Sequence, residues 1–150
     1  MIVFSLGDEH YGVSVNQVQS IERLMPITKV PRTLPFIRGV INLRENILPV
    51  VDLRERFRLP QKELTEETRI MVVNVAGVLT GLVVDAVLDV EVLEESSIEA
   101  APPLVGGVKA EYLRGMARVN NQVLILLNLS KILSDSEEEQ LREVEKSVHG

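Results

Sequence analysis

The chain has 150 residues, a length that suits one ordinary domain or two very small ones that share a core. It contains no cysteine, which excludes disulfides, thiolate metal sites and cysteine nucleophiles. The net charge of −6 and the 3% of aromatic residues argue against a nucleic-acid surface. Because no stretch approaches the roughly 20 apolar residues of a membrane helix, we expect a cytoplasmic protein without direct membrane insertion.

In chain order, the sequence predicts a series of β-hairpins. Each is a pair of apolar runs separated by a short group of turn-forming residues such as Gly, Asn or Asp. The turns fall at residues 7–10, 44–46, 74–77 and 120–121. Valine, which occurs 23 times, suits a pleated and half-buried surface better than a helix. We therefore expect a mostly β chain with many short strands, as in small barrels or a sandwich.

The second half of the sequence repeats the first. Residues 36–53 align without a gap on residues 112–129, at an offset of 76. Residues 11–15 resemble residues 80–84 at an offset of 69. Two copies of this length do not make an open repeat array. The repeat instead predicts two similar small barrels that pack on each other.

The repeat also predicts the domain organisation. One domain is expected at residues 1–134, with a first barrel at about residues 1–64 and a second at about residues 69–134. A domain of about 60 residues is marginal by itself, so the barrels should share a core. The sequence leaves open whether strands are exchanged between them.

Residues 135–150 predict an acidic C-terminal helix. Ser136 and Glu139 form a capping box, and acidic side chains near a helix N-terminus interact favourably with the helix dipole. Leu141 and Val144 recur at helical spacing and belong to a narrow apolar stripe. We expect this helix to dock on its own barrel, with binding to a partner as the alternative.

The ionisable residues do not form a catalytic set in the sequence. His10 falls at a predicted hairpin tip, where a solvated turn is expected rather than a metal ligand. Asp52 and Asp85 lie in apolar strands, and paired carboxylates can hydrolyse glycosides. Because such a hydrolase normally has an aromatic-rich cleft, we expect both carboxylates to cap turns or pair with arginines. No enzymatic activity, metal or cofactor is expected.

Arg44 lies at the tip that joins two apolar strands. A guanidinium held by a rigid hairpin can present a planar fork to a carboxylate of another molecule. An internal ion pair or a solubilising turn residue fits the sequence equally well. The residues together describe a binding module with a groove between the repeats, since docking in grooves or on edge strands needs no catalytic group.

Several motifs resemble those of CheW-type chemotaxis coupling proteins. The central ones are FIRGVINLR at residues 36–44 and ILPVVDLR at residues 47–54, and the resemblance covers about residues 2–133. The family usually has glycine after the Leu-Arg pair, where this chain has Glu45. Either Asn46 takes the turn conformation that suits this glycine, or the hairpin tip is shaped differently.

The resemblance implies a mostly β fold with two SH3-like, five-stranded β-barrel subdomains in one CheW-like domain. It implies a non-enzymatic adaptor that couples methyl-accepting chemoreceptors to the histidine kinase CheA and is recruited to membrane-associated arrays. The expected partners are the cytoplasmic tip of the receptors and the regulatory domain of CheA, and no cofactor is implied. A small-barrel module for another protein or ligand, RNA included, is the alternative.

The resemblance also implies two kinds of binding surface. The receptor tip would lie in a hydrophobic groove near the junction of the two subdomains. Carried over by motif position, the groove would use Val15, Val18, Ile21, Arg44, Val87 and Val90. Kinase contacts are expected at the barrel ends, with Gly39 and Gly81 as candidates, because a side chain there would obstruct a close backbone approach.

Overall fold

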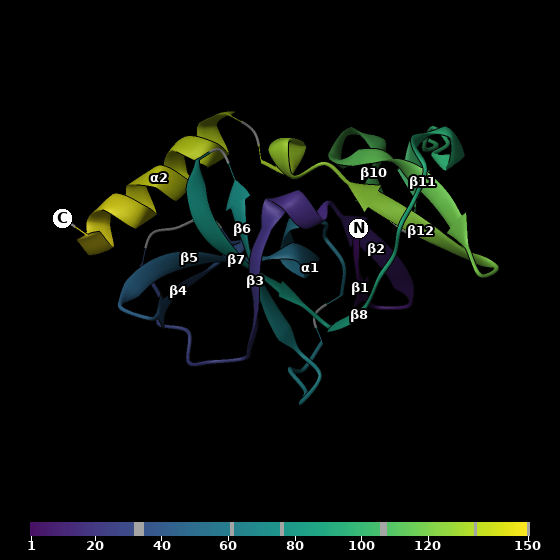
Figure 1. The fold of residues 1–150 in the computed structure, drawn as a ribbon. Helices are drawn as coiled ribbons and strands as arrows, with labels where there is room; N and C mark the ends of the chain where they lie inside the picture. The colour runs from purple at the N-terminus through teal and green to yellow at the C-terminus, as the bar shows by residue number, and fades with distance from the viewer. Residues whose placement is uncertain (32–34, 61, 76, 106–107, 134, 150) are drawn as a thin grey trace.

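The computed structural model describes residues 1–150 except residues 32–34, 61, 76, 106–107, 134 and 150. The described residues form two five-stranded sheets with a C-terminal helix, which confirms the expected mostly β fold (Figure 1). The strands of the first sheet, sheet I, are in order β3 (Val18–Arg23), β6 (Arg69–Val75), β7 (Val78–Val84), β5 (Asn46–Asp52) and β4 (Ile37–Leu43). Those of sheet II are β11 (Leu113–Val119), β12 (Gln122–Leu127), β2 (Glu9–Val13), β1 (Ile2–Leu6) and β8 (Ala86–Val90).

Shorter elements join these strands. The helix α1 (Leu53–Arg56) follows β5 directly, and β9 pairs with β10 in a separate two-stranded sheet. The remaining short elements are β9 (Leu104–Val105), β10 (Val108–Lys109), and the 3₁₀ turns η1 (Val15–Gln17), η2 (Glu95–Ser97), η3 (Ala110–Tyr112) and η4 (Leu129–Lys131).

Each sheet takes strands from both halves of the sequence. The hairpin β6–β7 lies in sheet I beside β3, β4 and β5, and the hairpin β1–β2 lies in sheet II beside β8, β11 and β12. In the repeat, β1–β2 corresponds to β6–β7, β3 to β8, and β4–β5 to β11–β12. The exchange that the sequence left open therefore occurs in the strand order. The boundary expected between the subdomains, after about residue 64 and before about residue 69, separates the repeats but not the sheets.

The repeat is visible in the strand register. Strand β5 runs parallel to β7 with Val50 opposite Gly81, and β12 runs parallel to β2 with Leu126 opposite Gly12. These two pairs occupy the same positions of the repeat. The two sheets thus share one topology, built twice from exchanged hairpins.

Gly39 and Gly115 occupy equivalent positions and have the same local role. Their φ angles are 145° and 156°, and each lies at a register shift in its strand pair. A Cβ atom would lie 2.0 Å from the carbonyl oxygen of Thr28 at Gly39, and 2.6 Å from that of Glu99 at Gly115. The glycines therefore let a neighbouring segment of the same chain approach and bridge to β4 or β11.

The core has one large cluster between the sheets and a small cluster on the other face of each sheet. Strand β6 shows how the side-chain alternation divides them. Met71 and Val73 belong to the large cluster, whereas Ile70 and Val72 belong to the small cluster of sheet I. In sheet II, Leu124 and Leu126 belong to the corresponding small cluster. Because strands of both halves share the large cluster, the two sheets bury their facing surfaces together.

Arg56 connects the two repeats at their junction. Its guanidinium lies 5.4 Å from the ring centroid of Phe36 and 4.8 Å from that of Tyr112, which are equivalent residues in the repeat. The same side chain donates to the carbonyl oxygen of Ile132 and, at 3.0 Å, to the carboxylate of Glu137. Contacts of a cation with ring faces and with a carboxylate are mutually compatible and favourable.

The C-terminal helix α2 (Asp135–His149) packs against β5 and β7 of sheet I. The helix therefore docks within the chain and contacts β7 of the second repeat, as expected, but it lies on sheet I rather than on sheet II with β11 and β12, the strands that precede it (Figure 1). The physical reason is that Leu141 and Val144 are buried in the central cluster, while Arg56 holds Glu137 near the helix start. No helix in the described part of the chain is long and apolar enough to cross a membrane.

Candidate binding surfaces

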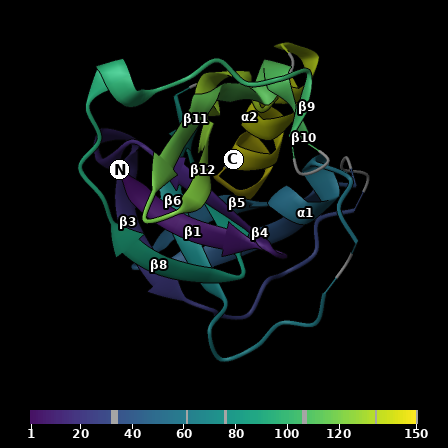
Figure 2. The same cartoon turned by 90° about the vertical axis from the view of Figure 1, so that its right-hand side faces the viewer.

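Four of the six expected groove residues lie on two equivalent edge strands. Val18 and Ile21 lie on β3, and Val87 and Val90 lie on β8. Strand β3 is the outermost strand of sheet I, and β8, which runs along the outside of β1, is the outermost strand of sheet II (Figure 2). An edge strand presents backbone groups and alternate side chains to a partner.

The groove residues differ in how far they are covered. Val18 and Val87 are half-buried and pack against the central cluster, so both edges adjoin the junction between the sheets. Val15, Ile21 and Val90 are 47%, 40% and 62% exposed. Burial of apolar side chains of this size by a partner stabilises the complex, because it removes apolar surface from water.

Sequence reasoning missed two further exposed apolar residues of this region. Leu88 on β8 is 45% exposed, and Val92, two residues beyond the strand end, is 93% exposed. The alternation Leu88, Val90, Val92 is a period-two apolar pattern that continues past β8. That pattern was the available signal, but it normally indicates a buried strand face rather than an uncovered one.

Arg44 lies at the tip of the β4–β5 hairpin with its side chain 72% exposed. A terminal nitrogen of its guanidinium is 3.4 Å from the carboxylate of Glu22 on β3. Neighbouring side chains of a strand point to opposite faces, so Arg44 lies on the face of β3 opposite to Ile21. The internal ion pair that the sequence left open is therefore present.

The turn at Arg44 has left-handed backbone. The φ angles are 48° at Arg44 and 72° at Glu45, and the equivalent residues Asn120 and Asn121 have 50° and 66°. Two successive positive φ angles are typical of a type I′ hairpin turn, in which glycine or asparagine is favoured. Glu45 itself therefore takes the conformation of the usual glycine, and Asn46, the alternative considered from the sequence, does not.

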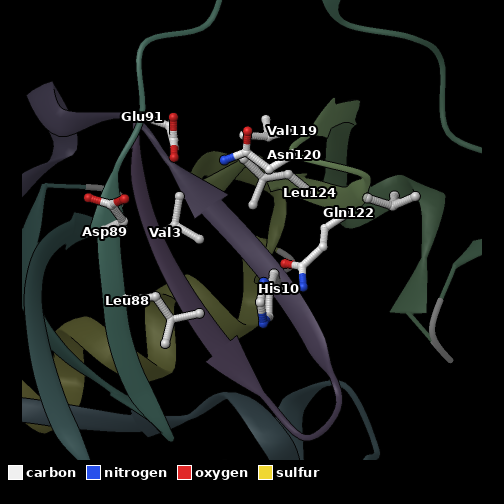
Figure 3. Close-up of a pocket in the computed structure, with 10 residues that line it drawn as sticks. Val3, His10, Leu88, Asp89, Glu91, Val119, Asn120, Gln122 and Leu124 are labelled. Atoms are coloured by element: carbon white, nitrogen blue, oxygen red, sulfur yellow. The ribbon is translucent and has the colours of Figure 1, made fainter.

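A shallow pocket lies beside the hairpin tip of each sheet. The sheet I pocket has a volume of about 310 Å³ and the sheet II pocket one of about 250 Å³. Figure 3 shows the residues that line the sheet II pocket. The sheet I pocket is lined by Gln19, Ser20, Leu43, Arg44, Asn46, Leu48, Val72 and Leu79. All their repeat counterparts line the sheet II pocket, namely Leu88, Asp89, Val119, Asn120, Gln122, Leu124, Val3 and His10. The two pockets therefore occupy equivalent positions of the repeat, but the sheet I pocket carries the cation Arg44 and the sheet II pocket carries the carboxylate Asp89.

We expected His10 in a solvated turn, but it lies on strand β2 and is half-buried at the sheet II pocket. The register of the β1–β2 hairpin starts at Leu6 and Glu9, which leaves Gly7 and Asp8 as the turn and includes His10 in the strand. Among the described residues, no three His, Asp or Glu side chains gather as a metal site requires.

Asp52 caps the helix α1, as expected from the sequence. Its Oδ1 accepts from the backbone N–H of Arg54 at 2.9 Å and of Glu55 at 3.3 Å. Its other oxygen is 3.6 Å from the Nε of Arg38. The equivalent Asn128 caps η4 in the same way. Asp and Asn at this repeat position share one structural role, which is to satisfy amide groups at the start of a turn.

Asp85 pairs with Arg54, which confirms the second expectation about the carboxylates. Oδ1 accepts from Arg54 Nε at 3.0 Å, and Oδ2 accepts from the other arm of the guanidinium and from Gly7 N–H at 2.8 Å. Burial alone would raise the pKa of Asp85, but the hydrogen bonds from Arg54 and Gly7 hold the pKa below its ordinary value. The pair therefore stabilises the fold above about pH 4, and this contribution is lost as the pH falls further.

Gly39 and Gly81, the expected kinase-contact residues, are both buried. At Gly81 a Cβ atom would lie 2.8 Å from the Cγ2 of Ile70, and at Gly39 it would overlap the backbone of Thr28. Packing within the chain therefore explains why neither position carries a side chain. The structure does not bring either of them to an exposed surface.

Comparison with known proteins agrees with this architecture. The model of the CheW-like domain matches residues 1–137. The chain is 39% identical over 140 residues to the chemotaxis protein CheW of Bacillus subtilis, covering 93% of this chain and 89% of that protein. It is 36% identical to CheW of Klebsiella aerogenes, covering 97% and 88%.

The chain belongs to the CheW family. A solved structure, the scaffolding protein TtCheW from Thermoanaerobacter tengcongensis, superposes with a TM-score of 0.83 at 36% identity, covering 91% of this chain and 88% of that one. As a CheW-family protein, the chain is a non-enzymatic scaffold that couples chemoreceptors to the kinase CheA. The function implied by the sequence motifs is thereby confirmed.

Proposed function

We propose that this CheW-family chain holds the cytoplasmic tip of a methyl-accepting chemoreceptor against strands β3 and β8, and binds the regulatory domain of CheA through a separate surface. The two contacts would recruit it to membrane-associated receptor arrays. The observation that carries the proposal is the uncovered apolar surface on these edge strands, with Ile21 40% and Val90 62% exposed. The proposed groove consists of Val15, Val18, Ile21, Val87 and Val90, and Arg44 lies across the β3 edge, on the face opposite to Ile21.

The chemistry of this surface suits a helical hairpin. Apolar residues of a helix recur at i, i+3 and i+4, and such a stripe can cover exposed aliphatic side chains of a sheet edge. Full burial of a valine or isoleucine stabilises a complex by about 1.5–3 kcal/mol. Several such contacts offset the cost of association, which is about 4–15 kcal/mol.

Arg44 contributes to this proposal through its charge. Its exposed guanidinium is held by Glu22 at 3.4 Å, a long and weak contact for an exposed pair. A carboxylate of the receptor tip can therefore replace Glu22, or share the guanidinium with it, at small cost. We propose this exchange as the role of Arg44 in receptor binding.

The kinase contact is proposed at the ends of the sheets. Because Gly39 and Gly81 are both buried, their proposed role is to allow close packing against Thr28 and Ile70 rather than to touch the kinase. A glycine-to-alanine variant at either position would place its Cβ against Thr28 or Ile70. Such a variant would disturb the packing of the fold and could not report on kinase binding alone. The proposal is better tested at an exposed residue of the sheet II hairpin tip such as Asn120, because Arg44 is assigned to the receptor contact.

The receptor contact is tested with one variant and a matched control. Val90→Glu places a charge in the proposed groove, and Val123→Glu places the same charge on a valine that is 44% exposed outside it. Calorimetric titration with a receptor-tip fragment should give about tenfold or weaker binding for Val90→Glu. Binding by Val123→Glu should stay within about twofold of the original chain. Equal losses in both variants, or none in Val90→Glu, would remove the β8 edge from the receptor site.

A further inference from the structure

The chain passes from one sheet to the other at two equivalent places. After β2 it reaches β3 of sheet I through the turn η1. After β7 it reaches β8 of sheet II through a single residue, Asp85. Both crossings lead directly into an edge strand of the proposed groove. Contacts that hold a crossing segment in place therefore also restrain the position of the edge strand that follows it.

Asp85 is fixed by contacts from two separate segments, the helix α1 and the end of β1 with its turn. Its carboxylate accepts from both arms of the Arg54 guanidinium and from the N–H of Gly7 in the β1–β2 turn. Its own N–H donates to the carbonyl oxygen of Ser5 at 3.0 Å. The third nitrogen of Arg54 donates to the carbonyl oxygen of Pro60 at 2.7 Å. The side chains of Arg54 and Asp85 are only 11% and 17% exposed.

The other crossing has no such pair among the described residues. The repeat counterpart of Asp85 is Asn16, which is exposed in η1. The counterpart of Arg54 is Ser130, whose N–H and hydroxyl both bond to Asn128 within its own turn. The backbone hydrogen bonds at η1 are local, from Gln17 N–H to the carbonyl of Ser14 and from Val18 N–H to that of Val15. The two crossings thus differ in how they are held, although the strands that they join are equivalent.

We propose that Arg54 and Asp85 are positioning residues for receptor binding, because they fix the crossing that leads into β8. The groove then has one fixed wall, β8, and one adaptable wall, η1 with β3. This inference rests on the proposed function, since it concerns the receptor groove. A bidentate pair suits the task, because a planar fork restrains orientation as well as distance.

The test uses carboxylate-to-amide substitutions at two similar ion pairs. Asp85→Asn removes the charge at the crossing, and Glu137→Gln does the same at the Arg56 pair, whose side chains are 16% and 20% exposed. Receptor-tip affinity, affinity for the regulatory domain of CheA, and amide hydrogen exchange are measured for each. Arg54→Lys, which keeps the cation but loses the fork, replaces Asp85→Asn if that variant does not fold.

The proposal predicts a loss confined to one partner and one strand. Asp85→Asn should bind the receptor tip about tenfold more weakly, bind the kinase domain within about twofold, and exchange faster in β8 than in β3. Glu137→Gln should keep both affinities within about twofold. Equal losses of receptor affinity in both variants, or an unchanged Asp85→Asn, would overturn the inference. An original chain that fails to bind the receptor tip would overturn the proposed function and this inference with it.

Discussion

At the scale of single residues, the most informative position is Glu45. Here a side chain with no preference for left-handed backbone adopts a φ of 72°. Such a conformation costs a residue other than glycine about 1–3 kcal/mol, which the rest of the hairpin must offset. The sequence predicted that something would be unusual at this tip, because it lacks the usual glycine. It did not show which residue would take the positive φ.

We predict that Glu45→Gly stabilises the chain. Removing the Cβ relieves the strained conformation, and the gain exceeds the extra entropy of glycine in the unfolded chain by about 0.5–1 kcal/mol. Chemical denaturation measures the difference. The control is Asn121→Gly in the equivalent turn, where asparagine already tolerates a φ of 66° and the gain should be smaller. A lower stability for Glu45→Gly would show that its side chain makes a compensating contact.

Tyr11 is the second informative residue. Its ring stacks between Phe4, at a centroid distance of 5.7 Å, and Phe57, at 6.3 Å. Its hydroxyl is buried and has no hydrogen-bond partner among the described residues. Burial, with a smaller effect of Glu9, raises the pKa of Tyr11 to about 12. The hydroxyl therefore loses hydration without a replacement.

Tyr11→Phe should keep the ring stack and remove the unsatisfied oxygen. We expect the free energy of unfolding to stay unchanged or to rise by up to about 1 kcal/mol. Thermal and chemical unfolding of the variant check this. A loss of more than about 1 kcal/mol would mean that the hydroxyl has a partner, such as an ordered water molecule.

At the scale of elements, the local pattern predicted the hairpins and the C-terminal helix well. The turn at residues 120–121 and the apolar stripe of α2 appear where the sequence places them. The docking site of α2 could not be predicted, because it depends on contacts between distant segments. The pair of Arg56 and Glu137 joins residues 81 positions apart. No local pattern contains that information.

The packing of α2 yields a direct prediction. Leu141 is fully buried in the central cluster, so Leu141→Ala should lower the free energy of unfolding by about 2–5 kcal/mol. Lys146→Ala on the exposed side of the same helix should change it by less than about 0.5 kcal/mol. Urea denaturation compares the two. A small effect of Leu141→Ala would indicate that α2 is detached in solution.

At the scale of the whole molecule, the repeat predicted two similar units but not their composition. Alternating apolar residues let β1–β2 pair with either half equally well, because both halves offer the same pattern. The exchange of hairpins follows from tertiary packing alone. The groove residues came from the family motifs, and only the structure distinguishes Val90, which is exposed, from Val87, which packs against the core. The sequence pattern alone cannot distinguish a valine that is buried in the core from one that is exposed and available for contact with a partner.

The central claim is that the edges β3 and β8 receive the chemoreceptor tip. The most direct measurement is NMR chemical-shift mapping of the isotope-labelled chain during titration with a receptor-tip fragment. The largest shifts are predicted in β3, β8 and the turn η1, around Ile21 and Val90. Saturable shifts confined to the hairpin tips at Arg44 and Asn120, with β8 unchanged, would contradict the claim.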